Sequence, residues 1–183
     1  MADNFGHQFA NNIYISKLSA NNLTSIISPN AFRNCCNLRE VYFPELIDIQ
    51  SVSGFYDCSE LQHVELPKLQ SINNSEGLFK GDTNLVNLDF QALTSIGNSD
   101  NVFRKCTSLL SVNFPSLLEL SQNTGMFLSC SSLSSIEFPV LSSLDKLTTK
   151  CMFKDCTNLK ILKMPAISST EFPKEWGDTF EGC

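Results

Sequence analysis

The chain has 183 residues and a net charge of −6, and its 13 basic residues are spread over the whole length. This balance argues against a nucleic-acid-binding protein and against docking on an anionic membrane surface. No apolar run approaches the roughly 18 residues that a membrane-spanning helix needs. The first residues also lack the basic and apolar segments of a signal peptide. By itself the sequence indicates a cytosolic protein with no nucleic-acid partner and no membrane insertion.

A phenylalanine recurs along the chain at nearly even steps of 23 to 27 residues. The eight positions are Phe9, Phe32, Phe55, Phe79, Phe103, Phe127, Phe153 and Phe180. A period of this length indicates that each unit is one supersecondary element, which must stack on its neighbours to bury its apolar face. We therefore expect a single repeat domain over 1–183, with its function on a repeated surface.

The units differ in regularity along the chain. Residues 1–31 hold an atypical N-terminal repeat, with Asn12 at the place where later units carry Cys. Regular repeats follow over 32–167, each with Cys three residues after its Phe, then Leu, an aliphatic residue and Pro. The unit at Phe79 departs from this pattern, with Asp82 in place of Cys and Gln91 in place of Pro. An irregular C-terminal end occupies 168–183.

Each unit is expected to contain one short strand, followed by a second extended piece and a turn. Val41 and Phe43 alternate with polar residues, which predicts a strand with these two side chains inward. A unit of this length has no room for a long helix, so we expect a second extended piece at 46–49 and a helical turn at 55–61. The sequence thus predicts a mainly β solenoid with short helical turns and about seven rungs.

The repeat motif resembles that of the BspA-like leucine-rich repeats. The residues that carry the resemblance are Met126-Phe127 with Cys130 and Leu133, Met152-Phe153 with Cys156 and Leu159, and Ala31-Phe32 with Cys35 and Leu38. It extends from about Phe9 to Cys183. The resemblance implies a right-handed leucine-rich-repeat solenoid in a secreted or cell-surface protein, often one that acts in adhesion or host contact. This implied location leaves three explanations for the missing leader: removal, trimming of a longer polypeptide, or an unusual intracellular or virion-borne member.

Six of the eight cysteines occupy one phase of the repeat. They are Cys35, Cys58, Cys106, Cys130, Cys156 and Cys183. Equivalent side chains on successive rungs point the same way, whereas a disulfide needs two Cβ atoms directed at each other. We therefore expect buried thiols that pack as small apolar groups. Cys36 and Cys151 lie off this phase and are candidates for exposed thiols. The sequence contains no C-x-x-C pair, the spacing that would suggest a zinc site, and we expect no metal and no cofactor.

The candidate binding surface is the strand face, formed by the outward residues on either side of the inward aliphatic residue of each unit. Its candidate ligand-binding residues are Glu40, Tyr42, His63, Glu65, Asn87, Asp89, Asn113, Glu137 and Lys163. Glu65 and Asp89 are expected on neighbouring rungs, about 5 Å apart, with Glu40 and His63 beside them. This cluster is either a cation site, a contact for a basic partner, or a solvated surface. We expect a protein or glycan ligand.

The other functional signals concern catalysis and the C-terminal end. Nucleophile-elbow, metalloprotease and phosphate-loop motifs are missing from the sequence, so we expect no enzyme. Phe172, Trp176 and Phe180 lie in the irregular end, where they either cap the last rung or form an assembly surface. The sequence therefore leaves three functions open: a binding module, a structural spacer that associates end to end, and an intracellular scaffold.

Overall fold

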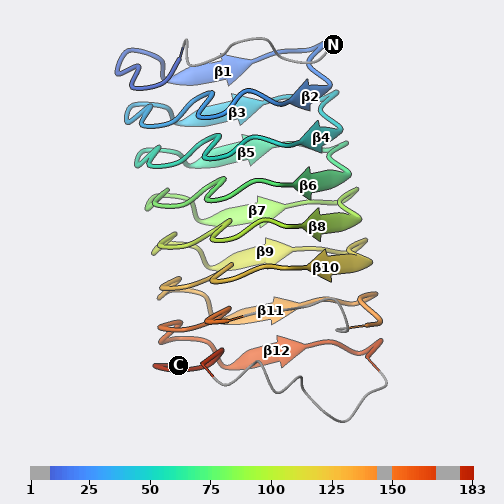
Figure 1. Ribbon diagram of the computed structural model, residues 1–183. Helices are drawn as coiled ribbons and strands as arrows, with labels where there is room; N and C mark the ends of the chain where they lie inside the picture. The colour runs from blue at the N-terminus through green and yellow to red at the C-terminus, as the bar shows by residue number, and fades with distance from the viewer. Residues whose placement is uncertain (1–8, 144–149, 168–177) are drawn as a thin grey trace.

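The computed structural model describes residues 9–143, 150–167 and 178–183 of the chain. This part of the chain winds into a stack of rungs that runs from β1 at one end to β12 at the other (Figure 1). The first series of strands comprises β1 (Lys17–Ser19), β3 (Glu40–Tyr42), β5 (His63–Glu65), β7 (Asn87–Asp89), β9 (Ser111–Asn113), β11 (Ser135–Glu137) and β12 (Ile161–Lys163). The second series comprises β2 (Ser25–Ile26), β4 (Asp48–Ile49), β6 (Ser71–Asn73), β8 (Ser95–Gly97) and β10 (Glu119–Ser121). The leucine-rich-repeat solenoid predicted from the sequence is confirmed.

Equivalent residues of successive units pair in the parallel sheets. Leu18 is opposite Val41, and Val41 is opposite Val64, so the register follows the sequence repeat. Because side chains alternate along a strand, Val41 is buried in the core while Tyr42 is exposed. The second extended piece predicted at 46–49 is also present, as β4.

The helical turn predicted at 55–61 is wrong, because the described residues contain no helix. Tight turns stand in its place, closed by bonds such as Cys58 N–H to Phe55 O at 3.2 Å and Leu61 N–H to Cys58 O at 2.9 Å. The residue two places after each repeat Phe has a positive φ, for example 57° at Asp57 and 62° at Lys105. A left-handed residue at this point interrupts a right-handed helix before a second turn can form.

Stacked phenylalanine rings run through the core of the solenoid. The rings of Phe32 and Phe55 lie 5.2 Å apart between centroids, and the other neighbouring pairs of the column lie at up to 5.8 Å. A second column joins Phe90 to Phe114 at 5.7 Å and Phe114 to Phe138 at 5.6 Å. Each internal ring therefore packs against the rung before it and the rung after it, and the columns hold successive rungs in register.

The phased cysteines form a column of thiols beside the phenylalanine column. All eight cysteines are free, and five of the six phased ones are buried, as predicted, whereas Cys183 is exposed. Each phased thiol donates a hydrogen bond to the carbonyl oxygen of the repeat Phe one rung earlier, as in Cys106 Sγ to Phe79 O at 3.0 Å. Cys36 and Cys151 are only half-buried. The column thus adds one weak donor to every rung junction except the one at Asp82, where the cysteine is replaced.

Candidate functional site

The strand face is built from the outward residues of the first series of strands. Every strand of this series presents two such side chains, because only its central residue points inward. The sequence-predicted residues lie here as follows: Glu40 and Tyr42 on β3, His63 and Glu65 on β5, Asn87 and Asp89 on β7, Asn113 on β9, Glu137 on β11, and Lys163 on β12. All nine are exposed or half-buried at the surface. The repeat thus brings residues far apart in sequence onto one surface.

The first part of the strand face spans β1, β3 and β5. Lys17 Nζ lies 2.7 Å from Glu40 Oε2 across neighbouring strands. The hydrogen bond between them lowers the pKa of Glu40 and raises the pKa of Lys17. Tyr42, whose exposed fraction is 40%, is opposite Glu65 in the register, and His63 is opposite Glu40. Together with the inward Val41, these side chains line an open hollow of about 520 Å³.

The hydrogen-bonded sheet beneath the strand face is interrupted between β5 and β7, and we call this interruption the parting. Among the described residues no ladder hydrogen bond joins β5 to β7, so the first series divides into a three-stranded and a four-stranded sheet. The inward residue of β5, Val64, is consequently half-buried, whereas Leu88 of β7 is buried. A hollow of about 390 Å³ lies across this parting, lined by Gln62, His63, Asn84, Val86, Asn87 and Ser108.

The parting also affects the expected pair of Glu65 and Asp89. The two residues lie on consecutive rungs, but their strands are not hydrogen-bonded to each other. Asp89 Oδ1 instead accepts hydrogen bonds from Asn113 Nδ2 at 2.9 Å and from Gln91 Nε2 at 2.7 Å. Neutral amide donors therefore hold this carboxylate in place, and it stays available to an incoming donor or cation.

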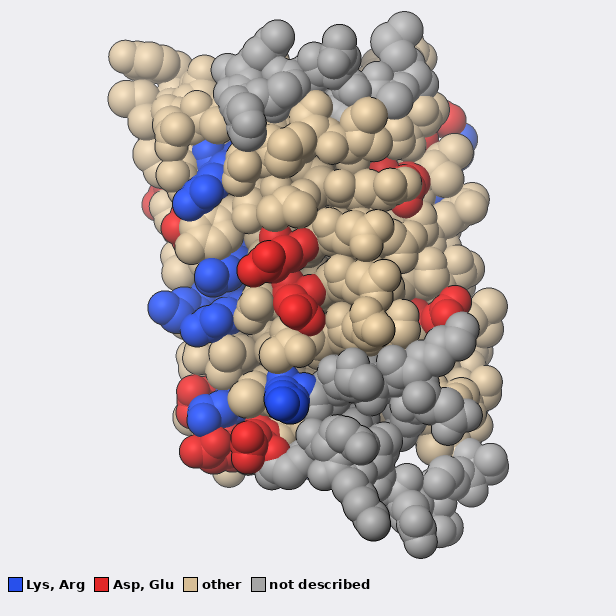
Figure 2. All heavy atoms as spheres, in the orientation of Figure 1, with Lys and Arg blue, Asp and Glu red and all other residues tan. Residues whose placement is uncertain are grey.

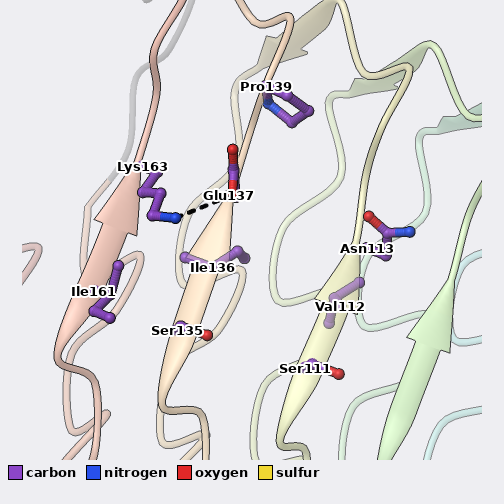
Figure 3. A pocket seen from close by; sticks show the side chains of 9 residues that line it. All are labelled: Ser111, Val112, Asn113, Ser135, Ile136, Glu137, Pro139, Ile161 and Lys163. Atoms are coloured by element: carbon purple, nitrogen blue, oxygen red, sulfur yellow. Dashed lines mark ion pairs between the residues drawn. The ribbon is translucent and has the colours of Figure 1, made fainter.

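The last part of the strand face spans β9, β11 and β12 (Figure 3). Lys163 Nζ lies 3.6 Å from Glu137 Oε2, and the two side chains point toward each other across the strands. Val112 and Ile136 line the inner part of a hollow of about 290 Å³, with Ser111 and Ser135 at one end. The half-exposed Ile161 borders it. This part offers hydroxyl and amide groups beside an apolar surface, which suits a partner with mixed polarity.

The strand face combines polar, charged and aromatic side chains. In the ranges that the structure describes, no group of three or more His, Cys, Asp or Glu side chains is placed to hold a metal ion. Within the same ranges, no helix is long and apolar enough to cross a membrane. The strand face presents hydrogen-bond donors and acceptors, one exposed aromatic ring and charges of both signs, in hollows that open to solvent.

The candidate assembly residues are described only in part. Phe180 stacks on Phe153 with centroids 5.7 Å apart, and its exposed fraction is 42%. Phe172 and Trp176 lie outside the described residues. Two inward residues of the last rung, Leu162 and Met164, are only half-buried. The end of the stack thus presents incompletely buried apolar side chains.

Another face of the molecule carries charges of both signs. In Figure 2 the blue side chains lie mostly on the left, where the turns that precede the first series of strands lie, and red side chains occur there as well as in the centre and on the right. In this region Tyr56 lies between two cations, with Arg33 Cζ and Lys80 Nζ each 4.8 Å from its ring centroid. Because Tyr56 is enclosed by these cation–π contacts, its ring is less available to a partner than that of Tyr42.

Similarity to known proteins supports the same architecture. A search of curated protein sequences returns no significant match. A leucine-rich repeat protein of T. pallidum has 26% sequence identity and a TM-score of 0.68, with 81% of this chain and 69% of that chain covered. A leucine-rich repeat protein of Bacteroides ovatus has 22% identity and a TM-score of 0.52, with 79% of this chain covered and only 47% of that chain.

The family itself is shown by the repeats. A model of the BspA-type leucine-rich repeat region matches the chain in six copies, over residues 6–124 and 76–175. These matches include the strand face and all members of the phenylalanine and thiol columns except Phe180 and Cys183. The chain belongs to the BspA-type leucine-rich repeat family.

Proposed function

We propose that this chain is a non-catalytic binding module that holds a protein or glycan partner against its strand face at a cell surface. Leucine-rich repeats of this family indicate a protein-interaction module. The observation that carries the proposal is the strand face itself, where polar, charged and aromatic side chains of successive rungs line three neighbouring hollows. A partner that contacts several rungs at once gains many weak contacts from a surface that is already ordered.

The rigidity of the strand face supports the same proposal. The inward side chains beneath it, such as Val41 and Leu88, are buried in one continuous core. Ser111 Oγ donates to Asn87 Oδ1 at 2.8 Å across neighbouring rungs, so outward side chains also hold one another. Binding would therefore require little ordering of the protein, which reduces the entropic cost of association.

The test compares matched variants of the two series of strands on the same target surface. Fluorescently labelled chain is titrated onto cultured epithelial cells, and the bound fraction is measured by flow cytometry. Tyr42→Ser/Asn87→Ser alters the strand face, and Leu118→Ser/Gln70→Ser alters exposed side chains next to the second series. We expect binding to fall at least about tenfold in the first variant and to stay within about twofold in the second. Loss of binding only in the second variant, or no binding by the wild type, would contradict the proposal.

A second candidate function is end-to-end assembly, supported by the half-buried apolar residues at both ends of the stack. At the first rung these are Phe9, Ile15 and Leu18, and at the last rung Leu162 and Met164. Because both ends carry the same repeat phase, head-to-tail contact between copies would continue the stack. Sedimentation velocity of wild type and Phe180→Ser over a wide concentration range tests this. Association that the substitution weakens supports assembly, and a monomeric wild type at every concentration rejects it.

A further inference from the structure

One member of the thiol column is replaced by an acid inside the solenoid. Asp82 lies three residues after Phe79, where the neighbouring units carry Cys, and its side chain is completely buried. A buried carboxylate without a counter-charge costs far more free energy than a buried neutral acid. The protonation state of Asp82 therefore affects the stability of the junction between this rung and the one before it.

The neighbouring units show what the position requires. In six units the thiol donates to the carbonyl oxygen of the repeat Phe one rung earlier, at 2.9 to 3.1 Å. By the repeat, the equivalent acceptor for Asp82 is the carbonyl of Phe55. A carboxylate has no hydrogen to donate, whereas a carboxylic acid has one O–H donor. Only the neutral acid reproduces the hydrogen bond that cysteine makes elsewhere in the column.

The two oxygens of Asp82 have different surroundings. Oδ1 accepts a hydrogen bond from the backbone N–H of Cys58 at 2.8 Å. Oδ2 is buried and has no hydrogen-bond partner among the described residues. The unpartnered oxygen is thus the one that a proton would turn into a donor.

The groups around Asp82 favour its neutral form. The titratable groups that face it are the thiols of Cys58 on the rung before and Cys106 on the rung after, together with the carboxylate of Asp57. None of these groups is a cation. Burial raises the pKa of Asp82 most, the negative charge of Asp57 raises it further, and the hydrogen bond from the Cys58 amide opposes both effects.

We propose that Asp82 is a neutral acid in the folded chain, that its Oδ2–H donates to the Phe55 carbonyl, and that losing this proton to solvent loosens the junction between the rungs of β5 and β7. Among the described strands of the first series, β5 and β7 are the neighbouring pair that shares no ladder hydrogen bond. The hollow lined by His63 and Asn87 lies across the same junction. Ionisation of Asp82 therefore changes the spacing of the strand face at its centre.

The direction of the pH effect follows from proton linkage. The folded chain holds a proton on Asp82 that the unfolded chain releases near the ordinary aspartate pKa of about 3.9. The stability that this proton supports is fully present below that value and is lost as pH rises through the folded pKa. The effect opposes that of an ordinary ion-paired carboxylate, which supports stability only when it is charged.

Carbon-13 NMR of the aspartate carboxyl carbons in the wild-type chain tests the proposal directly. We expect the Asp82 signal to titrate at a pH well above the ordinary aspartate pKa of about 3.9. An Asp82 titration at or below that ordinary value would overturn the proposal. This measurement requires no substitution, so it decides the protonation state even if variants fail to fold.

Denaturation of matched variants tests the coupling to stability. In Asp82→Asn the amide can accept from Cys58 and donate to Phe55 without titrating, and Asp82→Cys restores the residue of the neighbouring units. Relative to either variant, the unfolding constant of the wild type should rise by up to tenfold per pH unit between about pH 4 and the folded pKa. Asp57→Asn, the control, removes an exposed neighbouring charge and should keep most of that slope. Parallel stability curves for wild type and Asp82→Asn would overturn the proposal.

Backbone hydrogen exchange shows whether the loosening is local. After the exchange rates are corrected for their intrinsic pH dependence, they give the equilibrium constant for local opening at the Cys58 amide. This constant should increase with pH in the wild type and not in Asp82→Asn. Amides at a junction with a cysteine, such as that of Cys130, should show no such difference. An equal pH response at both junctions in the wild type would contradict a switch located at Asp82.

Discussion

The rings of Phe79 and Phe103 stack with centroids 5.8 Å apart and planes within 3° of parallel, although 24 residues separate them in the chain. The same contact recurs along the stack, from Phe9 on Phe32 to Phe153 on Phe180. Each rung thus contributes one ring that is packed on both sides, except at the ends. The solenoid therefore depends on its internal rings more than on any terminal one.

Replacing Phe103 by Ala should lower the free energy of unfolding by about 3 to 5 kcal/mol. Phe103 is fully buried and contacts the rings of Phe79 and Phe127 on either side. Phe180→Ala, the matched change at the half-exposed end, should cost less than half as much, because it loses one ring contact. Urea denaturation followed by circular dichroism measures both. Equal losses in the two variants would show that the column does not act as a continuous core.

Replacing Lys105 by Gly should raise the free energy of unfolding by about 0.5 to 1 kcal/mol. Lys105 has a φ of 62°, a left-handed conformation in which its Cβ is sterically unfavourable. The equivalent residues Gly81 and Gly182 have no Cβ and adopt this conformation without strain. Thr107→Gly in the next turn, which the bond from Leu109 N–H to Cys106 O closes and where φ is not positive, should instead destabilise the chain. Thermal unfolding of the three proteins gives the comparison. If both glycine variants lose stability, strain at Lys105 is not significant.

A thiol reagent should modify at most three of the eight cysteines in the folded chain. The buried members of the column are inaccessible, while Cys36, Cys151 and Cys183 are half-buried or exposed. Burial also raises the pKa of Cys156 to about 12, so its reactive thiolate is scarce at neutral pH. Mass spectrometry of labelled protein, before and after unfolding in urea, counts the modified sites. Rapid labelling of Cys106 in the folded state would contradict the buried column.

Replacing Cys106 by Ser should lower the free energy of unfolding by about 1 to 2 kcal/mol. A serine hydroxyl can still donate to Phe79 O, but a more polar group then occupies an apolar site. Cys183→Ser at the exposed end, the control, should change stability by less than about 0.5 kcal/mol. A reducing agent should leave the wild-type melting temperature unchanged. A large fall in that temperature would require a disulfide.

Much of the fold is predictable from the sequence because each rung repeats the same contacts. The recurrence of Phe32, Phe55 and Phe79 gives the number of rungs, and the alternation around Val41 shows which side chains point inward. The helical turn expected at 55–61 followed only from the length of the unit, which leaves no room for a longer helix, and not from a pattern of residues in the turn itself. Backbone conformation at Asp57 decides against the helix, and residue types alone show this only weakly, since Asn, Asp, Lys and Gly all occupy that position.

Two features of the structure were not predicted from the sequence. A buried polar column runs through Ser51, Ser75, Ser99 and Asn123, each four residues before a repeat Phe, and its side chains bond to backbone carbonyls of earlier rungs. The repeated small polar residue at that phase was an available signal. The parting between β5 and β7 was also missed, because strand pairing depends on how whole rungs fit together. The only sequence signs of an unusual rung were Asp82 and Gln91.

A substitution scan of both series of strands tests the proposed binding function most directly. Ala replaces, one at a time, each outward residue of β3, β5, β7, β9 and β11 and each exposed residue of β4, β6, β8 and β10. The variants are displayed, and their folding and their binding to cultured epithelial cells are measured together. Binding through the strand face predicts that losses without misfolding cluster on the first series, around Tyr42, Asn87 and Asn113. Losses that cluster on the second series, or that spread evenly over both, would contradict the strand face as the binding surface.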